Sequence, residues 1–289
     1  MTLVSTLSSH TKSRETSDIK IRRREIFIWV AVILLLNQLF YGIKEDWSAS
    51  LENLFYDLAA IGAFQFMAWY VIFGLLRASD PVPAARWRDI LVAAALCLLV
   101  FLPMSRAIWV AAVGIAIYLF IFNGGDLKLR AAATVLAGLS VQEYWGHIFF
   151  NLVAFPLLSA ETAAVGTILA AIRPGTGWQD NMITGPNGFG IVVYSACSSF
   201  HNVSLAVLCW LTVSRWRDQD EWRRDLVMLG VVAGTMILIN LLRLCLMAWD
   251  VDFYDYWHTG PGADIFAIAA SIAVLLISLY GSRPTKQMQ

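Results

Sequence analysis

Residues 226–249 read LVMLGVVAGTMILINLLRLCLMAW, and Arg243 is the only charged residue among them. An apolar helix of about 20 residues is long enough to cross the hydrocarbon core of a bilayer. Runs of this kind recur along a chain that is 58% hydrophobic and 15% charged, whereas a soluble domain carries about 25% charged residues. Lipid has to cover the apolar surface of such a chain. The sequence therefore predicts an all-α polytopic membrane protein.

The hydrophobic segments predict a bundle of about eight transmembrane helices. The positions of Lys and Arg support this count, because positive residues accumulate on the cytoplasmic side of membrane proteins. With the N-terminus in the cytoplasm, 17 of the 21 Lys and Arg lie inside, three lie outside (Lys44, Arg106 and Arg173), and Arg243 lies within a span. An odd number of spans would destroy this asymmetry, so we expect both termini in the cytoplasm. The expected spans are about 26–43, 58–76, 90–103, 106–122, 131–152, 194–213, 226–249 and 264–280.

The sequence shows no sign of a second folded domain. Residues 1–24 begin with a polar segment rich in Ser and Thr, and we expect a disordered cytoplasmic tail there. A single transmembrane domain is expected over residues 25–285. The first apolar run has no small-residue cleavage site after it, so we interpret it as a span and not as a signal peptide.

Two segments on the expected outer face are longer than a connector needs to be. Residues 44–57 carry apolar residues at helical spacing, which predicts a short helix lying on the membrane surface. Residues 159–172 predict another interfacial helix. Residues 182–193 contain two short β-prone arms around Pro186-Asn187-Gly188, which indicates a small hairpin. This hairpin leads directly to Cys197.

Cys197, Arg243 and His258 come from three different stretches, yet this topology places all three near the outer membrane face. A thiol, a guanidinium and an imidazole are the components of a cysteine-nucleophile acyl-transfer site. Asn240 precedes Arg243 by three residues and shares its helix face, and a charge within a span indicates a functional site unless it is paired or reaches the interface. The alternatives are a packed thiol, a snorkelling arginine and an interfacial histidine. A disulfide between Cys197 and Cys245 also stays open, because the outer face can be oxidising.

Further polar residues are expected in the same region. His201 follows Cys197 by four residues and would share a helix face with it, so it competes with His258 as the base. Glu143 and His147 form an i, i+4 pair in the outer half of the fifth span. That spacing can hold a metal, but a zinc site needs three or four ligands. We therefore expect no metal and interpret the pair as polar residues that line the same cavity.

Three short motifs follow one another in the second half of the chain: Ala196-Cys197-Ser198, Asn240-x-x-Arg243 and His258-Thr259-Gly260. With these motifs, residues 130–280 resemble the exosortase/archaeosortase family of membrane-embedded transpeptidases. The resemblance implies that the cysteine is the nucleophile, that the arginine and the histidine assist it, and that no cofactor is needed. The family has a Gly after Cys-Ser where this chain has Ser199. A serine there narrows the cleft or supplies a new hydrogen bond.

The resemblance also implies a substrate and a location. The substrate is a membrane-anchored protein whose C-terminal sorting tail contains a short motif, a transmembrane helix and a basic cluster. Cleavage takes place at the outer face of a cytoplasmic (inner) membrane, through a thioacyl-enzyme intermediate.

Other functions compete with this one. A transporter would favour polar residues at the membrane midplane and repeat symmetry, neither of which is visible. A non-catalytic assembly factor for exported exopolysaccharide is another alternative, and the acidic residues at 250, 252, 255 and 264 leave a lipid-linked glycosyltransferase open. The net charge of zero gives no support for a nucleic-acid partner, which would need a basic patch.

Overall fold

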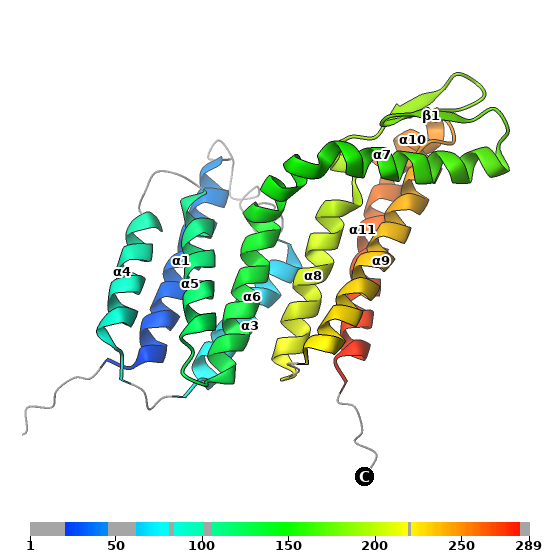
Figure 1. The fold of residues 1–289 in the computed structure, drawn as a ribbon. Coiled ribbons are helices and arrows are strands. Elements are labelled where there is room, and N and C mark those ends of the chain that lie inside the picture. Colours follow the sequence, from blue (N-terminus) through cyan, green and yellow to red (C-terminus); the bar gives the residue numbers. More distant parts are fainter. Residues whose placement is uncertain (1–20, 46–61, 81–83, 101–105, 219–220, 284–289) are drawn as a thin grey trace, which may run out of the picture.

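Helices form most of the chain that the computed structural model describes, which is residues 21–45, 62–80, 84–100, 106–218 and 221–283. Each of the expected spans overlaps a helix of a side-by-side bundle (Figure 1). The polytopic all-α fold expected from the sequence is therefore confirmed. The bundle helices are α1 (Arg23–Glu45), α3 (Ala63–Ala78), α4 (Trp87–Val100), α5 (Ala107–Ile121), α6 (Leu127–Ser140), α8 (Ser199–Trp216), α9 (Trp222–Met247) and α11 (Pro261–Gly281).

The outer surface of the bundle is apolar. Leu98, Leu238 and Leu276 are each at least 60% exposed, on α4, α9 and α11. Facing water, a leucine at such a position would forgo roughly 1.5–3 kcal/mol of burial energy, whereas lipid covers it without cost. Helices α9 and α11 are long and apolar enough to cross a membrane. Length, composition and surface together identify a membrane protein.

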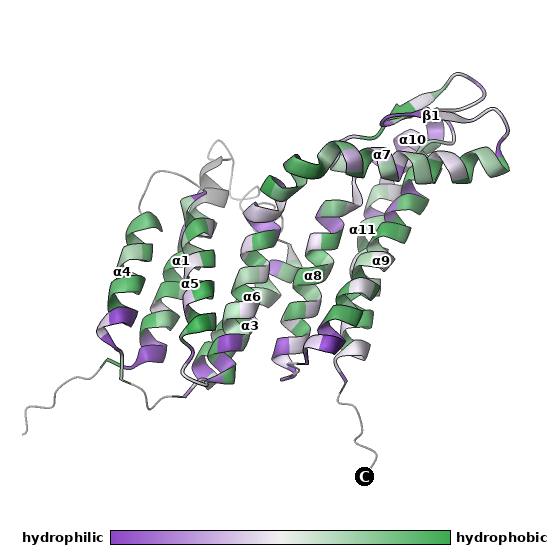
Figure 2. Ribbon diagram, in the orientation of Figure 1, coloured by the Kyte–Doolittle hydropathy of each residue, from purple (hydrophilic) through white to green (hydrophobic). Residues whose placement is uncertain are grey.

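The two ends of the bundle differ in charge. Helix α1 begins and α11 ends at one end, called here the lower end, and Figure 2 shows hydrophilic residues gathered there. Arg23 and Asp89 form a buried ion pair of 2.9 Å at this end, which joins the first turns of α1 and α4. The opposite, upper end carries Arg106 and Arg173. The basic residues near the lower helix ends are Arg22, Arg23, Arg24, Arg77, Arg86, Arg88, Lys128, Arg130, Arg215, Arg217, Arg223, Arg224 and Arg283.

The expected span 131–152 is wrong in its second half. A π-helical turn, Val141–Trp145, follows α6, and the chain then enters α7 (Gly146–Ile172). The N–H of Gly146 donates to the carbonyl of Val141, and a Cβ at position 146 would lie only 2.7 Å from that carbonyl oxygen. Glycine is therefore needed at this bend. Beyond it α7 leaves the bundle and lies across its upper end (Figure 1), so the interfacial helix expected at 159–172 is the second half of α7.

A small sheet and a short helix complete the upper end. Strands β2 (Met182–Thr184) and β3 (Gly190–Val192) pair antiparallel, which confirms the expected hairpin. Strand β1 (Gly177–Gln179) adds to its free edge and was not expected. Buried residues of the sheet and of α7 belong to one apolar cluster, so the sheet rests on that helix. Helix α10 (Val251–His258) lies between the spans expected at 226–249 and 264–280.

Two expectations fall largely outside the described residues. The first is the tail over residues 1–24, of which the structure describes only the last few residues; α1 begins at Arg23. The second is the interfacial helix at 44–57, of which the structure describes only the end of α1.

Candidate active site

Cys197 ends a single 3-10 turn, Ser195–Cys197, between strand β3 and helix α8. Its side chain is buried, with 8% exposure, and belongs to an apolar cluster that includes Val165 of α7 and Leu244 of α9. The cysteine is free, so the disulfide left open by the sequence does not form in this structure. Helix α8 begins two residues later.

Asn240 holds the backbone of Cys197. Its side-chain amide donates a 2.9 Å hydrogen bond to the Cys197 carbonyl, and both groups are buried. A buried carbonyl without a partner costs about 1–3 kcal/mol, so this contact fixes the turn against α9. The sequence placed Asn240 beside Arg243 but gave no indication of its partner.

Arg243 lies one helical turn further along α9 and binds the end of α10. Its Nε donates to the carbonyl of Trp257 at 3.0 Å, and one terminal nitrogen donates to the carbonyl of His258 at 3.3 Å. The last carbonyls of a helix have no partner within the helix, and a cation is favoured there by the helix dipole. Arg243 is therefore paired within the protein, and it fastens α10 to α9.

His258 is the last residue of α10. Its ring stacks on Tyr254, with the ring centroids 4.8 Å apart and the planes 15° from parallel. Tyr254 in turn meets Phe189, the residue before strand β3, edge-on at 6.3 Å. The imidazole is thus supported from one side by an aromatic ring that packs against the hairpin turn.

One turn of α9 therefore connects the two other segments, since Asn240 binds Cys197 and Arg243 binds His258. The connection runs through backbone carbonyls. Within the described part of the chain, the thiol forms no hydrogen bond with the guanidinium or with the imidazole. The structure brings the three residues into one region without direct side-chain contact.

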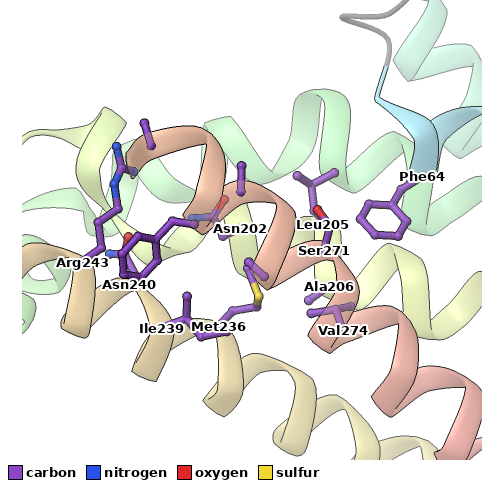
Figure 3. A pocket seen from close by; sticks show the side chains of 14 residues that line it. Phe64, Asn202, Leu205, Ala206, Met236, Ile239, Asn240, Arg243, Ser271 and Val274 are labelled. Atoms are coloured by element: carbon purple, nitrogen blue, oxygen red, sulfur yellow. The ribbon is translucent and has the colours of Figure 1, made fainter. Parts of the chain in front are cut away.

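A cavity of about 150 Å³ lies beside this region, between α8, α9 and α11. Arg243 and Asn240 line its upper part, and Asn202 of α8 and Ser271 of α11 add further polar groups (Figure 3). The rest of the lining is mainly apolar and includes Met236, Ile239, Val274 and, at the side of α3, Phe64. A peptide segment with one polar group among apolar neighbours suits such a lining.

Glu161 is a buried carboxylate that the sequence analysis missed. It lies on α7 with 5% exposure, and its Oε1 accepts from the backbone N–H of Ser199 at 3.0 Å and from the hydroxyl of Ser198 at 3.3 Å. The hydroxyl of Ser199 also donates to Oε1. The serine at this position therefore supplies a hydrogen bond, which was one of the two expected consequences. No sequence signal pointed to Glu161, because its partners are 37 and 38 residues away.

His201 of α8 and His147 of α7 lie close to each other. Their ring centroids are 6.1 Å apart, and both line a second cavity of about 270 Å³ together with Gln142, Ser195 and Ser204. The helix-face argument that paired His201 with Cys197 is wrong, because Cys197 precedes the first residue of α8. His258 thus lies in the network of Asn240 and Arg243, and His201 lies outside it.

Glu143 and His147 do not form the expected pair. Glu143 belongs to the π-helical turn, where the i, i+4 geometry of an α-helix does not hold, and it accepts a hydrogen bond from Gln65 of α3. Gln65 also donates to Gln142 at 3.3 Å. Glu143 therefore belongs to a polar contact between α3 and the bend. No group of three or more His, Cys, Asp or Glu that could hold a metal occurs among the described residues.

Comparison with known proteins identifies a family. Residues 47–275 match the model of a family described as transmembrane exosortase (Exosortase_EpsH). This match covers most of the chain, includes Cys197, Arg243 and His258, and begins well before the 130–280 region that the motifs indicated. No curated protein and no solved structure matches the chain.

Proposed function

This chain belongs to the transmembrane exosortase family, and we propose that it is a membrane-embedded cysteine transpeptidase. Its substrates would be membrane-anchored proteins that carry a C-terminal sorting tail. It would cut the chain before the anchoring helix and transfer the new C-terminus to an acceptor or to water. Cys197, Arg243 and His258 would perform the chemistry, with Asn240 and Ser198 in support.

The observation that carries this proposal is the double connection made by α9. Asn240 fixes the segment of the nucleophile, and Arg243 fixes the end of the helix that presents His258. The backbones of the cysteine and of the histidine are thus fixed to the same helical turn, which supports a shared site for the two residues. Catalytic contacts often form only in the complex with substrate. A scissile bond placed between the two segments would therefore come within reach of both Cys197 and His258.

The proposed reaction has two steps. In the first, the thiolate of Cys197 attacks the carbonyl carbon, and an S–C bond forms as the carbonyl oxygen becomes negative. Protonated His258 gives its proton to the leaving amine, the C–N bond breaks, and a thioester remains on the enzyme. In the second step, His258 removes a proton from the acceptor amine or water, the acceptor attacks the thioester, and the thiolate leaves.

Arg243 would stabilise the negative oxygen in both steps. A guanidinium has five N–H donors, and the contacts with α10 use two of them. The remaining donors are available to the oxyanion.

The cavity between α8, α9 and α11 is the proposed entry of the substrate. It reaches from Arg243 to apolar residues deeper in the bundle (Figure 3). A sorting tail contains a polar cleavage motif followed by an apolar helix, and the cavity offers both polar and apolar lining residues. The substrate helix would lie against the bundle within the bilayer.

The asymmetry of charge supports the orientation. Because basic residues gather at the lower end of the bundle, the positive-inside rule would place that end in the cytoplasm. The two chain ends would then be cytoplasmic, and Cys197 would face the outer side of an inner membrane.

A non-catalytic role, such as a factor that assists exopolysaccharide export, is the competing proposal, and one experiment separates the two. A tagged candidate substrate is expressed together with the wild type, with Cys197→Ala, or with Cys245→Ala. Cys245 is a matched control, because it is also a free cysteine beside the same apolar cluster. We expect Cys197→Ala alone to abolish processing at normal expression. Equal processing in all three would exclude the enzyme.

A further inference from the structure

The buried carboxylate of Glu161 is next to the segment of the nucleophile, yet it belongs to the helix that lies outside the bundle. Its Oε1 takes three hydrogen bonds, all from the two residues that follow Cys197. Two of the donors are the N–H and the hydroxyl of Ser199, the first residue of α8. The third is the hydroxyl of Ser198.

A buried carboxylate needs this many partners. Burying a charge is costly unless hydrogen bonds and opposite charge compensate for it. The N-terminus of α8 supplies both, since its first N–H groups are free of helical partners and carry partial positive charge. Within the described residues the second oxygen of Glu161 has no partner, so all of the compensation comes from Ser198 and Ser199. Any movement of these two residues would leave the charge unsatisfied.

The segment 197–199 is therefore held from two directions. On one side Asn240 of α9 binds the Cys197 carbonyl. On the other side Glu161 of α7 binds the next two residues. Two anchors on a stretch of three residues leave the peptide units little freedom to rotate. They thereby determine where the Cys197 side chain points.

Resting on the function proposed above, we propose that Glu161 is a positioning residue for the nucleophile. It holds the 197–199 segment so that the thiol meets the substrate carbonyl in the geometry needed for attack. The carboxylate does this from α7, so the interfacial helix sets the position of the thiol. A displacement of about 1 Å at a reacting group costs up to about 100-fold in rate, which gives such an anchor a measurable effect.

The first test does not depend on catalysis. In a protein whose other three cysteines are alanine, the rate at which a water-soluble maleimide labels Cys197 reports how well the segment is held. Glu161→Ala should raise this rate by about tenfold, because it removes three hydrogen bonds to a charged group. Glu161→Gln keeps an acceptor oxygen and should stay within about threefold of the wild type. Thr162→Val is the matched control: Thr162 is buried on the same helix, its hydroxyl has no partner within the described residues, and its labelling rate should not change.

The second test uses processing of a tagged substrate. Glu161→Ala should lower kcat by about tenfold or more with little change in KM, because the substrate cavity is not lined by Glu161. Glu161→Gln should restore most of kcat. A residue that acts only as a helix cap would reduce the amount of folded protein and leave the kcat of the folded fraction unchanged.

If Glu161→Ala does not fold, Ser199→Ala decides the matter, because it removes a hydroxyl that binds the same carboxylate oxygen and should raise the labelling rate above that of Thr162→Val. The proposal is overturned if Glu161→Ala, or Ser199→Ala in its place, labels and processes like Thr162→Val. Failure of the wild type to process any substrate would count against the enzyme function alone, because the labelling result stands without it.

Discussion

Replacing Arg243 by lysine should loosen α10 without unfolding the bundle. The guanidinium donates two hydrogen bonds, of 3.0 and 3.3 Å, to the carbonyls of Trp257 and His258. An ammonium on a flexible stem does not reproduce this fork and would keep at most one of the two. A hydrogen bond from a charged group contributes about 1.5–3 kcal/mol. We therefore expect α10 to open about 10- to 150-fold more often.

Hydrogen–deuterium exchange measures this opening directly. The amide of Tyr254, which donates to Asp250, and the amide of Thr259, which donates to Asp255, should exchange faster in Arg243→Lys, whereas the amides of α8 should not. Arg106→Lys makes the same chemical change at the start of α5, at the upper end of the bundle, and should leave α10 unaffected. Unchanged exchange in α10 would refute the role given to Arg243. Processing by Arg243→Lys should fall as well, because the oxyanion loses the guanidinium donors.

Three further changes test other contacts of the site and the fold. Asn240→Ala leaves the Cys197 carbonyl unpaired in a buried place, so the free energy of unfolding should fall by about 1–3 kcal/mol and kcat should fall with it; a melting curve in detergent and a processing assay together check this. Tyr254→Ala removes the ring on which His258 stacks and should lower kcat about 2- to 12-fold, the equivalent of 0.5–1.5 kcal/mol, whereas Tyr254→Phe should process like the wild type; equal rates for both variants would contradict the stacking role. Asp89→Asn breaks a buried ion pair at the lower end of the bundle. The free energy of unfolding should therefore fall by about 3–5 kcal/mol, while the kcat of the folded molecules stays unchanged.

The sequence predicted the spans well because each of them obeys one simple physical rule. A stretch such as 226–249 has to be a helix in lipid, where every backbone group needs an internal partner, and α9 covers nearly the same residues. The Pro186-Asn187-Gly188 turn was equally readable, since glycine adopts the positive φ of 76° found at Gly188 without strain. Local rules of this kind give helices and turns.

The bend between α6 and α7 was not readable in the same way. Residues 131–172 are mostly hydrophobic, with only scattered polar residues, so the sequence marks no boundary between the two helices. A π-helical turn also has no characteristic composition that would reveal it. Only the close approach of Gly146 to the Val141 carbonyl shows why the chain turns there. For the same reason His147 and Glu143 were assigned to one helix face that does not exist.

The sequence proposed the residues of the candidate site and gave no indication of their contacts. Cys197, Arg243 and His258 were proposed from their chemistry and their place in the expected topology. The partners of these residues are backbone carbonyls and a carboxylate from a distant helix, and such contacts depend on how α7, α9 and α10 pack at the upper end. Glu161 is the clearest example, because its role depends on a fold that brings residue 161 to residues 198 and 199.

The most direct test of the chemistry is a search for the acyl group on the enzyme. The purified wild type is mixed with a tagged substrate, quenched in acid and analysed by tandem mass spectrometry of its cysteine peptides. We predict a substrate fragment attached to Cys197 through a bond that hydroxylamine cleaves, as a thioester requires, and no such fragment in Cys197→Ala. An adduct on any other residue, or continued processing by Cys197→Ala, would show that this thiol is not the nucleophile.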